Sequence, residues 1–305
     1  MGSYGTGAPY VNGGDVQNKG FEFGANWRDK IQDLTYGINA NFSYNKNEVT
    51  HIANGEGIIH GPSNILSHQT AELYRAEEGY PIGYFWGYKT AGLFQNNEEV
   101  EAYILNGEAI IPGAVPGDVR FVDRNNDGKI DDNDKCMIGD PNPDVNLGFS
   151  FNVGYKGFDF NVAATGVIGN QIAKSYRSTN LPFQNYTTTI LNRWHGEGTS
   201  NTTPRITATG SHINNLYISD LYIQDGDYLR ISNITLGYDF KKMFTHLPVS
   251  KARLYMTGQN LITITGYDGL DPEVGYGYGS SWANGIDIGS FPIPHVYMIG
   301  VSIKY

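Results

Sequence analysis

Residues 33–45, DLTYGINANFSYN, decide the fold, because apolar and polar side chains alternate through them without interruption. One face of the expected strand carries Leu34, Tyr36, Ile38, Ala40, Phe42 and Tyr44, and the other carries Thr35, Gly37, Asn39, Asn41, Ser43 and Asn45. Successive side chains of a β-strand point to opposite faces, so this pattern predicts a strand longer than most soluble strands. The polar face has amides, hydroxyls and glycine but no full charge, which favours a water-filled lumen over an ordinary protein surface.

The same alternation recurs along the rest of the chain. It is found at 21–27, at 145–168 around a turn at 156–157, and then at 227–240, 251–265 and 294–305. Within 227–240 the apolar residues change from odd to even positions, which predicts a β-bulge near Ser232–Asn233. Counting the alternating segments predicts roughly eight membrane-spanning strands.

The connections between the expected strands alternate between short and long. Short turns are expected at 29–33, 156–157 and 241–250, and long segments rich in Gly, Asn and Pro at 46–82, 91–144, 169–226 and 266–293. A soluble sandwich rarely contains four loops of that size, whereas outer-membrane barrels combine short periplasmic turns with long extracellular loops. Flanking Asn and Gly residues predict two short loop helices, near 97–106 and 187–194. We therefore predict an all-β fold, an antiparallel transmembrane β-barrel segment that forms only part of a barrel.

Composition narrows the possible functions. The 305 residues include 39 Gly, 22 Tyr and 14 Phe, only 17% are charged, and the net charge of -10 argues against nucleic acid as a partner. No apolar run approaches the 18 residues that a transmembrane helix needs, a limit that does not apply to barrel strands. Cys136 is the single cysteine, so a disulfide framework and a thiolate zinc site are both excluded. The seven histidines form no HExxH motif and no nucleophile–His–carboxylate pattern is present, so we do not expect an enzyme.

Residues 123–134, DRNNDGKIDDND, have the spacing of a calcium-binding loop. Gly128 stands sixth in this twelve-residue frame, where such a loop turns sharply, and Ile130 stands eighth. The expected calcium ligands are Asp123, Asn125, Asp127 and Asp134 through side chains, Lys129 through its carbonyl, and Asp131 directly or through water. The alternative is a solvated acidic turn held by Asx hydrogen bonds.

The residues on either side of this loop indicate what kind of site it is. Pro112, Pro116 and Gly117 precede it and GDPNPD at 139–144 follows it, so neither flank can form the long helix of a paired EF-hand. The twelfth position is Asp rather than the longer Glu. We therefore expect a structural calcium brace inside an extracellular loop at 116–144 rather than a calcium switch.

Aromatic residues gather in the expected outer loops. Tyr84, Trp86, Trp194 and Trp282 are candidate substrate-binding residues, because exposed rings beside polar side chains stack on sugar faces. The alternatives for each ring are a place in the aromatic girdle at the membrane interface and ordinary loop packing.

Five segments, taken in order, resemble one family. They are NKGFEFGANWRDK (18–30), GYPIGYFWGYKTAGLFQ (79–95), PGDVRFVDRNNDGKIDDNDKCMIGDPNPD (116–144), DLYIQDGDYLRISNITLGY (220–238) and RLYMTGQNLITIT (253–265). Together they resemble the C-terminal part of SusC/RagA-type TonB-linked outer-membrane transporters, from about residue 10 to the terminus.

The resemblance implies a function. It implies a segment of an importer of large nutrients, oligosaccharides or peptides, in the outer membrane of Bacteroidetes-like bacteria. It further implies a SusD-like lipoprotein over the barrel and energy from the TonB–ExbB–ExbD system through an N-terminal region. Residues 1–305 are then expected to be the C-terminal part of the barrel, without the signal peptide and plug domain of the family.

A second hypothesis from another class is a secreted, calcium-stabilised β-sandwich that binds carbohydrate. A barrel wall would show one continuous apolar band facing lipid, whereas a sandwich would bury that face.

Overall fold

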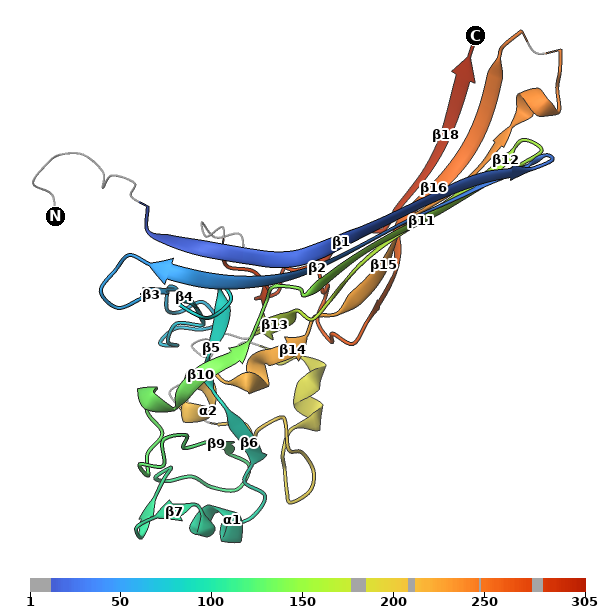
Figure 1. Ribbon diagram of the computed structural model, residues 1–305. Coiled ribbons are helices and arrows are strands. Elements are labelled where there is room, and N and C mark those ends of the chain that lie inside the picture. Colours follow the sequence, from blue (N-terminus) through green and yellow to red (C-terminus); the bar gives the residue numbers. More distant parts are fainter. Residues whose placement is uncertain (1–11, 177–184, 208–211, 247, 276–281) are drawn as a thin grey trace, which may run out of the picture.

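A computed structural model describes residues 12–176, 185–207, 212–246, 248–275 and 282–305. Its main feature is a long, curved antiparallel sheet of seven strands in the order β1-β2-β11-β12-β15-β16-β18 (Figure 1). The strands are β1 (Gly14–Ile31), β2 (Leu34–Ile52), β11 (Val145–Tyr155), β12 (Phe158–Ile168), β15 (Tyr228–Asp239), β16 (Lys251–Thr265) and β18 (Val296–Lys304). The predicted all-β antiparallel fold is confirmed, with seven strands described where the sequence predicts roughly eight.

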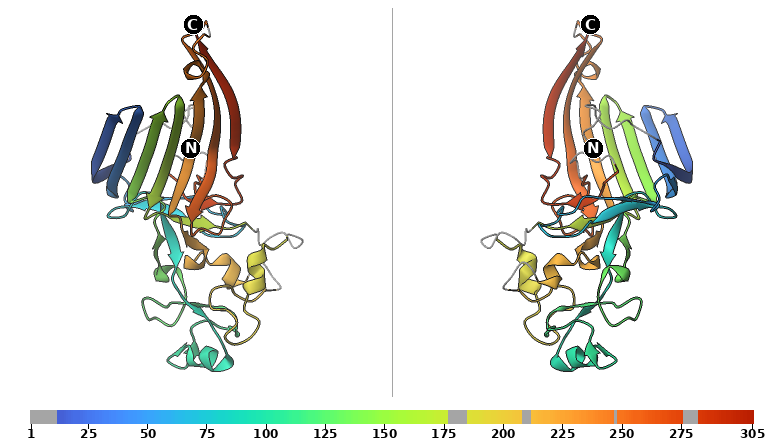
Figure 2. Two further views of the ribbon diagram at one scale, coloured as in Figure 1. Left: turned by 90° about the vertical axis from the view of Figure 1, so that its right-hand side faces the viewer. Right: turned by 90° about the vertical axis from the view of Figure 1, so that its left-hand side faces the viewer.

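The two ends of this sheet differ as predicted. β1 and β2 are joined by Gln32–Asp33, a shorter turn than the predicted 29–33 because β1 continues to Ile31. β11 and β12 are joined by Lys156–Gly157, whose φ angles of +46° and +95° suit a tight hairpin turn. Three long segments, 53–144, 169–227 and 266–295, connect strands at the opposite end. The sequence predicts four, and the first two form one segment because residues 83–90 add no strand to this sheet. The views in Figures 1 and 2 place these segments together below the sheet, and we call their described residues the loop module. The chain ends at the hairpin end of the sheet, away from the module.

The predicted bulge is also confirmed. The register of β15 against β16 shifts between Ile231 and Asn233, and the register against β12 shifts between Ala163 and Ala164. The extra residue, Ser232, restores the apolar side chains that follow it to the same face of the sheet.

One face of the sheet is apolar across all seven strands. Phe42 pairs with both Phe23 and Leu147, and Met256 pairs with both Leu236 and Ile299. This face is uncovered, because Phe23 is 62% exposed, Met256 59% and Ile299 72%. A sandwich would bury these side chains, so the sandwich alternative is not favoured.

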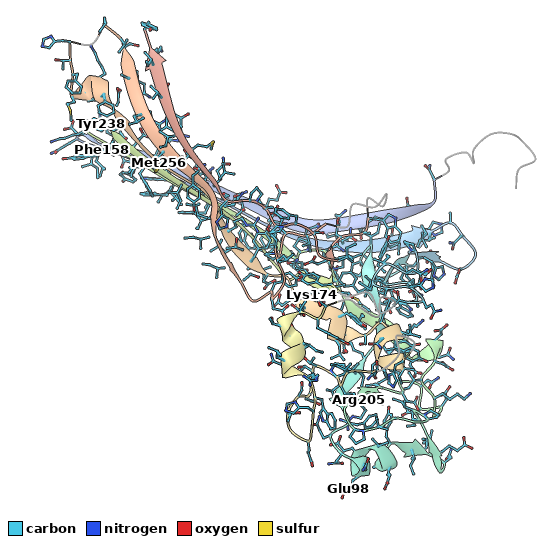
Figure 3. All side chains as sticks on the ribbon, turned by 180° about the vertical axis from the view of Figure 1, so that it is seen from behind. Glu98, Phe158, Lys174, Arg205, Tyr238 and Met256 are labelled. Carbon is cyan, nitrogen blue, oxygen red and sulfur yellow. The ribbon has the colours of Figure 1, made fainter. Side chains whose placement is uncertain are left out.

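Aromatic rings border the apolar face at the hairpin end. The ring centroids of Phe158 and Tyr238 lie 4.4 Å apart, and those of Tyr238 and Phe240 lie 5.1 Å apart. Figure 3 shows Phe158, Tyr238 and Met256 on the part of the sheet far from Arg205 and Glu98 of the loop module. A ring of this kind suits the boundary between lipid and water.

The loop module has smaller sheets of its own. A four-stranded sheet has the order β10-β5-β4-β3, a three-stranded sheet β14-β13-β17, and two pairs are β6-β9 and β7-β8. Their bounds are β3 (Ile58–His60), β4 (Tyr74–Glu77), β5 (Tyr84–Tyr88), β6 (Thr90–Leu93), β7 (Ile104–Leu105), β8 (Glu108–Ala109), β9 (Val119–Phe121), β10 (Lys135–Gly139), β13 (Gln171–Lys174), β14 (Ile223–Asp225) and β17 (Ile286–Asp287). Helical turns are α1 (Asn97–Ala102), α2 (Ile213–Leu216), η1 (Asp132–Asp134), η2 (Thr188–Asn192), η3 (Asp220–Tyr222) and η4 (Phe240–Lys242), the last of which lies in the main sheet's β15–β16 connection.

The hydrophobic core of the described chain lies in or against this module. One cluster contains the fully buried Leu73, Tyr74 and Phe85, and a second contains Phe94 and Phe121. A third cluster joins Val49 and Ile52, at the end of β2, to Ala76 of β4. The long loops are therefore a packed unit with sheets of its own, whereas the sequence predicts only two short helices there.

The two predicted loop helices are present but shorter than expected. The side chain of Asn96 accepts a hydrogen bond from the Glu99 backbone N–H and so caps α1, as predicted. The helix ends at Ala102 rather than 106, because Asn106 and Gly107 take positive φ angles in the turn between β7 and β8. The second is a 3₁₀ turn, η2, rather than an α-helix.

None of the helices in the described ranges has the length and hydropathy needed to cross a bilayer.

Candidate functional site in the loop module

A cavity of about 550 Å³ lies within the loop module, in the size range of small-molecule sites. Four separate stretches of chain line it: 69–72, β5 from Trp86 to Tyr88, 130–135, and 216–218. It brings one predicted aromatic residue, Trp86, beside one predicted calcium ligand, Asp131.

Alternate residues of β5 place three aromatic rings on one side of that strand. Tyr84 is fully buried and its hydroxyl donates to the Glu77 carboxylate at 2.5 Å. Burial, reinforced by Glu77, raises the pKa of Tyr84 above its ordinary value. The next two rings, Trp86 and Tyr88, line the cavity.

Each of the two rings in the cavity has a close partner. The Arg75 guanidinium carbon lies 3.9 Å from the ring centroid of Trp86, a cation–π contact. Tyr217 stacks on Tyr88, with ring centroids 4.6 Å apart and planes 14° apart. Burial raises the pKa of Tyr88 above its ordinary value.

Charged side chains form the rest of the wall. The Lys135 ammonium lies 2.7 Å from the Asp132 carboxylate, and this contact holds the pKa of Asp132 below its ordinary value. Glu72 is paired with Arg75 and with His60, whose Nδ1 lies 2.7 Å from the Glu72 carboxylate. Among the lining side chains three are acidic, Glu72, Asp131 and Asp132, and one, Lys135, is basic.

The predicted calcium loop forms a hydrogen-bonded turn beside this cavity. Asp123 accepts the backbone N–H groups of Asp127 at 3.2 Å and Gly128 at 2.8 Å. Asp134, which is fully buried, accepts those of Arg124 and Asp131, both at 2.8 Å. These two carboxylates therefore hold the loop closed from its two ends.

The side chains between them make Asx-type bonds. Asn125, Asp127 and Asp131 each accept the N–H two residues further on, at 3.0, 3.0 and 2.9 Å. Within the described ranges, no three His, Cys, Asp or Glu side chains are gathered as a ready-made metal site.

The donor set of this loop still suits calcium. An ionised carboxylate has about four lone-pair positions, so these hydrogen bonds leave oxygen capacity for a hard cation. Calcium binding by the six residues named above stays a prediction. The loop ends in the short turn η1 and lies between β9 and β10, not between two long helices, as its flanks indicate.

The four predicted substrate-binding aromatics do not form one site. The rings of Tyr84 and Trp86 lie 6.1 Å apart, but Tyr84 is fully buried and its contacts describe a packing role. Trp194 lies against Gly117, where an added Cβ would come within 2.4 Å of the Trp194 ring. Trp282 meets Tyr74 edge-on, at 4.7 Å and 80°. Substrate binding at these rings stays a prediction, and Trp86 is the one that lines the cavity.

Sequence reasoning missed three of the residues that shape this cavity, Glu72, Lys135 and Tyr217. Tyr217 is more than 120 positions from Tyr88 in the chain, and no local pattern connects two residues so far apart. The GYPIGYFWGYKT stretch did single out the aromatic floor on β5, although not what faces it.

Comparison with curated proteins gives four significant matches, and no protein-family model matches the chain. TonB-dependent receptor P3 of Formosa agariphila is 33% identical over 96% of this chain and 29% of the relative. TonB-dependent receptor SusC of Bacteroides thetaiotaomicron is 29% identical over 96% of this chain and 27% of the relative. The chain thus spans less than a third of the length of these relatives.

Solved structures show the same fold. The RagAB peptide transporter structure matches with a TM-score of 0.70 at 20% identity, over 99% of this chain and 31% of that chain. The RagAB peptide importer in its open-open state matches with a TM-score of 0.67 at 19% identity, over 96% of this chain and 29% of that chain. The sheet and the loop module are thus both covered by these matches.

Proposed function

Because this chain belongs to the SusC/RagA-type TonB-dependent receptors, which are outer-membrane proteins, we propose that it forms part of the barrel wall of a nutrient importer. The observation that carries the proposal is the single apolar band that runs across all seven strands and stays exposed. Exposing that apolar band to water would cost free energy, whereas in a bilayer the band faces lipid.

The opposite face of the sheet has the chemistry of a solute pathway. Asn39 pairs with Ser150, Asn152 pairs with Asn161, and Thr235 pairs with Thr257. Small neutral polar groups bind water and passing solutes weakly and reversibly, which suits transport rather than catalysis. We therefore propose that this face lines the lumen.

The loop module is proposed to contact both substrate and partner. It gathers on the side of the sheet opposite the short hairpins, where an outer-membrane barrel has its extracellular loops (Figure 2). A SusD-like surface lipoprotein would rest there, and the substrate would be a large oligosaccharide or peptide. Energy would come from TonB–ExbB–ExbD through the region of the relatives that this chain does not match.

We further propose that the loop 123–134 binds calcium as a structural brace. Its support is the register of five Asp or Asn residues with Gly128, whose φ of +87° makes the sharp turn. The bound ion would neutralise carboxylates that otherwise repel one another and would stiffen the module between β9 and β10.

Uptake and fractionation test the main proposal. In the native host, the whole protein should be recovered in the outer-membrane fraction, and deletion of its gene should abolish uptake of a fluorescent oligosaccharide or peptide. A co-purifying surface lipoprotein is expected from detergent extracts. Recovery in the periplasm or culture fluid, with uptake unchanged in the deletion strain, would exclude an importer.

A further inference from the structure

We propose that the cavity over Trp86 binds a protonated amine carried by the imported nutrient. This inference rests on the proposed function, since it names the chemistry of a ligand for that importer. Aromatic rings and carboxylates both line this cavity.

The charge of the surroundings selects a cation. Residues 130–135, which supply one wall, contain three Asp and one Lys. Three carboxylates and one ammonium line the cavity itself. An anionic ligand would be repelled there, and a neutral ligand would gain nothing from this field.

The protein's own cations show that the cavity lining stabilises positive charge. Arg75 lies over the ring of Trp86, and the Lys135 ammonium lies 5.4 Å from the ring centroid of Tyr88. Both distances fall within the range of cation–π attraction. A ligand ammonium in the cavity would meet the remaining faces and edges of these rings.

Two carboxylates have capacity for that ligand. The Asp132 side chain is 88% exposed and has Lys135 as its ion-pair partner, and Asp131 accepts one backbone N–H. Glu72 differs, because it is only 13% exposed and is held by Arg75 and His60. An ammonium group has three donors and no acceptor, so it can bond to either carboxylate, and to Asp132 without competing with calcium.

Two sources carry this group: basic side chains of peptides and amino sugars. The test uses the whole transporter purified in detergent, with Trp fluorescence and calorimetry to measure binding. The probes are a lysine-containing peptide, its acetylated form, a glucosamine oligosaccharide and its N-acetylated form. We expect one or both amine probes to bind at least tenfold more tightly than their acetylated forms.

Variants locate the binding. Asp132→Asn is expected to weaken amine binding about five- to tenfold, and Trp86→Leu by a similar factor. Asp132 is exposed and is not a candidate calcium ligand, so this change leaves the fold and that donor set intact. Glu98→Gln is the matched control, because it removes one exposed charge from the loop module outside the cavity.

The outcomes are separable. Equal binding of acetylated probes, no binding of either amine probe, or an equal loss in Glu98→Gln would each overturn the proposal. A negative result in this binding assay does not contradict the proposed importer function, because outer-membrane recovery and uptake are measured independently of it.

Discussion

Arg253 and Asp159 form a two-bond ion pair on the polar face of the sheet, and the pair passes directly over Gly237. The Arg253 Nε and Nη2 atoms lie 2.8 and 2.5 Å from the two carboxylate oxygens. Gly237 lies opposite Asp159 in the neighbouring strand, and an added Cβ there would come within 2.6–2.7 Å of both partners. Glycine is therefore required at this position because a side chain would occupy the space of the ion pair.

Gly237→Ala should accordingly break this ion pair. We expect a loss of about 1–2 kcal/mol, the sum of a partly exposed ion pair and a steric shift. The measurement is the thermal midpoint of the barrel in detergent, followed by its heat-modifiable mobility on gels. In an Asp159→Asn background, Gly237→Ala should reduce the stability by a smaller amount, because the carboxylate charge is already absent. Equal costs in both backgrounds would contradict the proposed contact.

Two adjacent positions of β15 distinguish the lipid face from the lumen face. Leu236 is 55% exposed on the apolar band, whereas Thr235 points to the polar face and bonds to Thr257. Leu236→Arg should impair membrane assembly by about 2–4 kcal/mol, while Thr235→Arg should assemble nearly normally. The amount of folded protein in outer-membrane fractions gives the answer. If the two variants assemble equally well, Leu236 does not face lipid.

Calcium should raise the thermal stability of the loop module if the brace is present. We expect the midpoint to fall when chelator is added, and Asp127→Ala to remove this dependence. Asp127 is exposed, so Asp127→Ala should reduce the thermal stability only slightly when chelator has removed calcium. No calcium dependence in the parent protein would leave the hydrogen-bonded turn as the whole role of the loop.

Asp134→Ala is expected to destabilise the same loop with or without calcium. Its buried carboxylate satisfies two backbone N–H groups, and their loss costs about 1–3 kcal/mol for each group left unpaired. Asp134→Asn should recover part of this loss, because an amide oxygen still accepts one N–H. If Asp134→Ala has the same thermal midpoint as the parent protein in chelator, the Asp134 carboxylate is not buried against these two N–H groups.

The chain expressed alone should require detergent. Its sheet has an uncovered apolar face and two edge strands, β1 and β18, and both features promote aggregation in water. Light scattering and size-exclusion chromatography with and without detergent test this expectation. A monodisperse, cooperatively melting monomer in plain buffer would be inconsistent with a partial barrel.

The wall of the barrel was predictable from the sequence for a physical reason. Each wall strand separates lipid from water, so its side chains must alternate, and residues 33–45 show that rule without reference to any distant residue. The bulge at Ser232 could be found in the same way, as a change of parity. The turn at Lys156–Gly157 could also be predicted, because it separates two alternating runs.

The loop module could not be predicted in the same way. Its packing depends on contacts between distant segments, such as the Thr90 hydroxyl bonded to Asp220 at 2.7 Å and Arg205 bonded to the buried Asp118 at 2.6 Å. No periodic pattern signals such pairs. For the same reason the sequence located Trp86 and Asp131 as candidates but not the cavity that brings them together.

The 19-residue strand β2 belongs to both parts of the molecule. It pairs with β1 and β11 in the wall, while Val49 and Ile52 near its end are buried against Ala76 of the module. Val49 is also clamped by two backbone bonds, to Tyr80 and from Gly79, both 2.8 Å. The module therefore cannot tilt against the wall unless β2 bends or these bonds break. A force applied to the loop module is therefore transmitted through β2 to the wall.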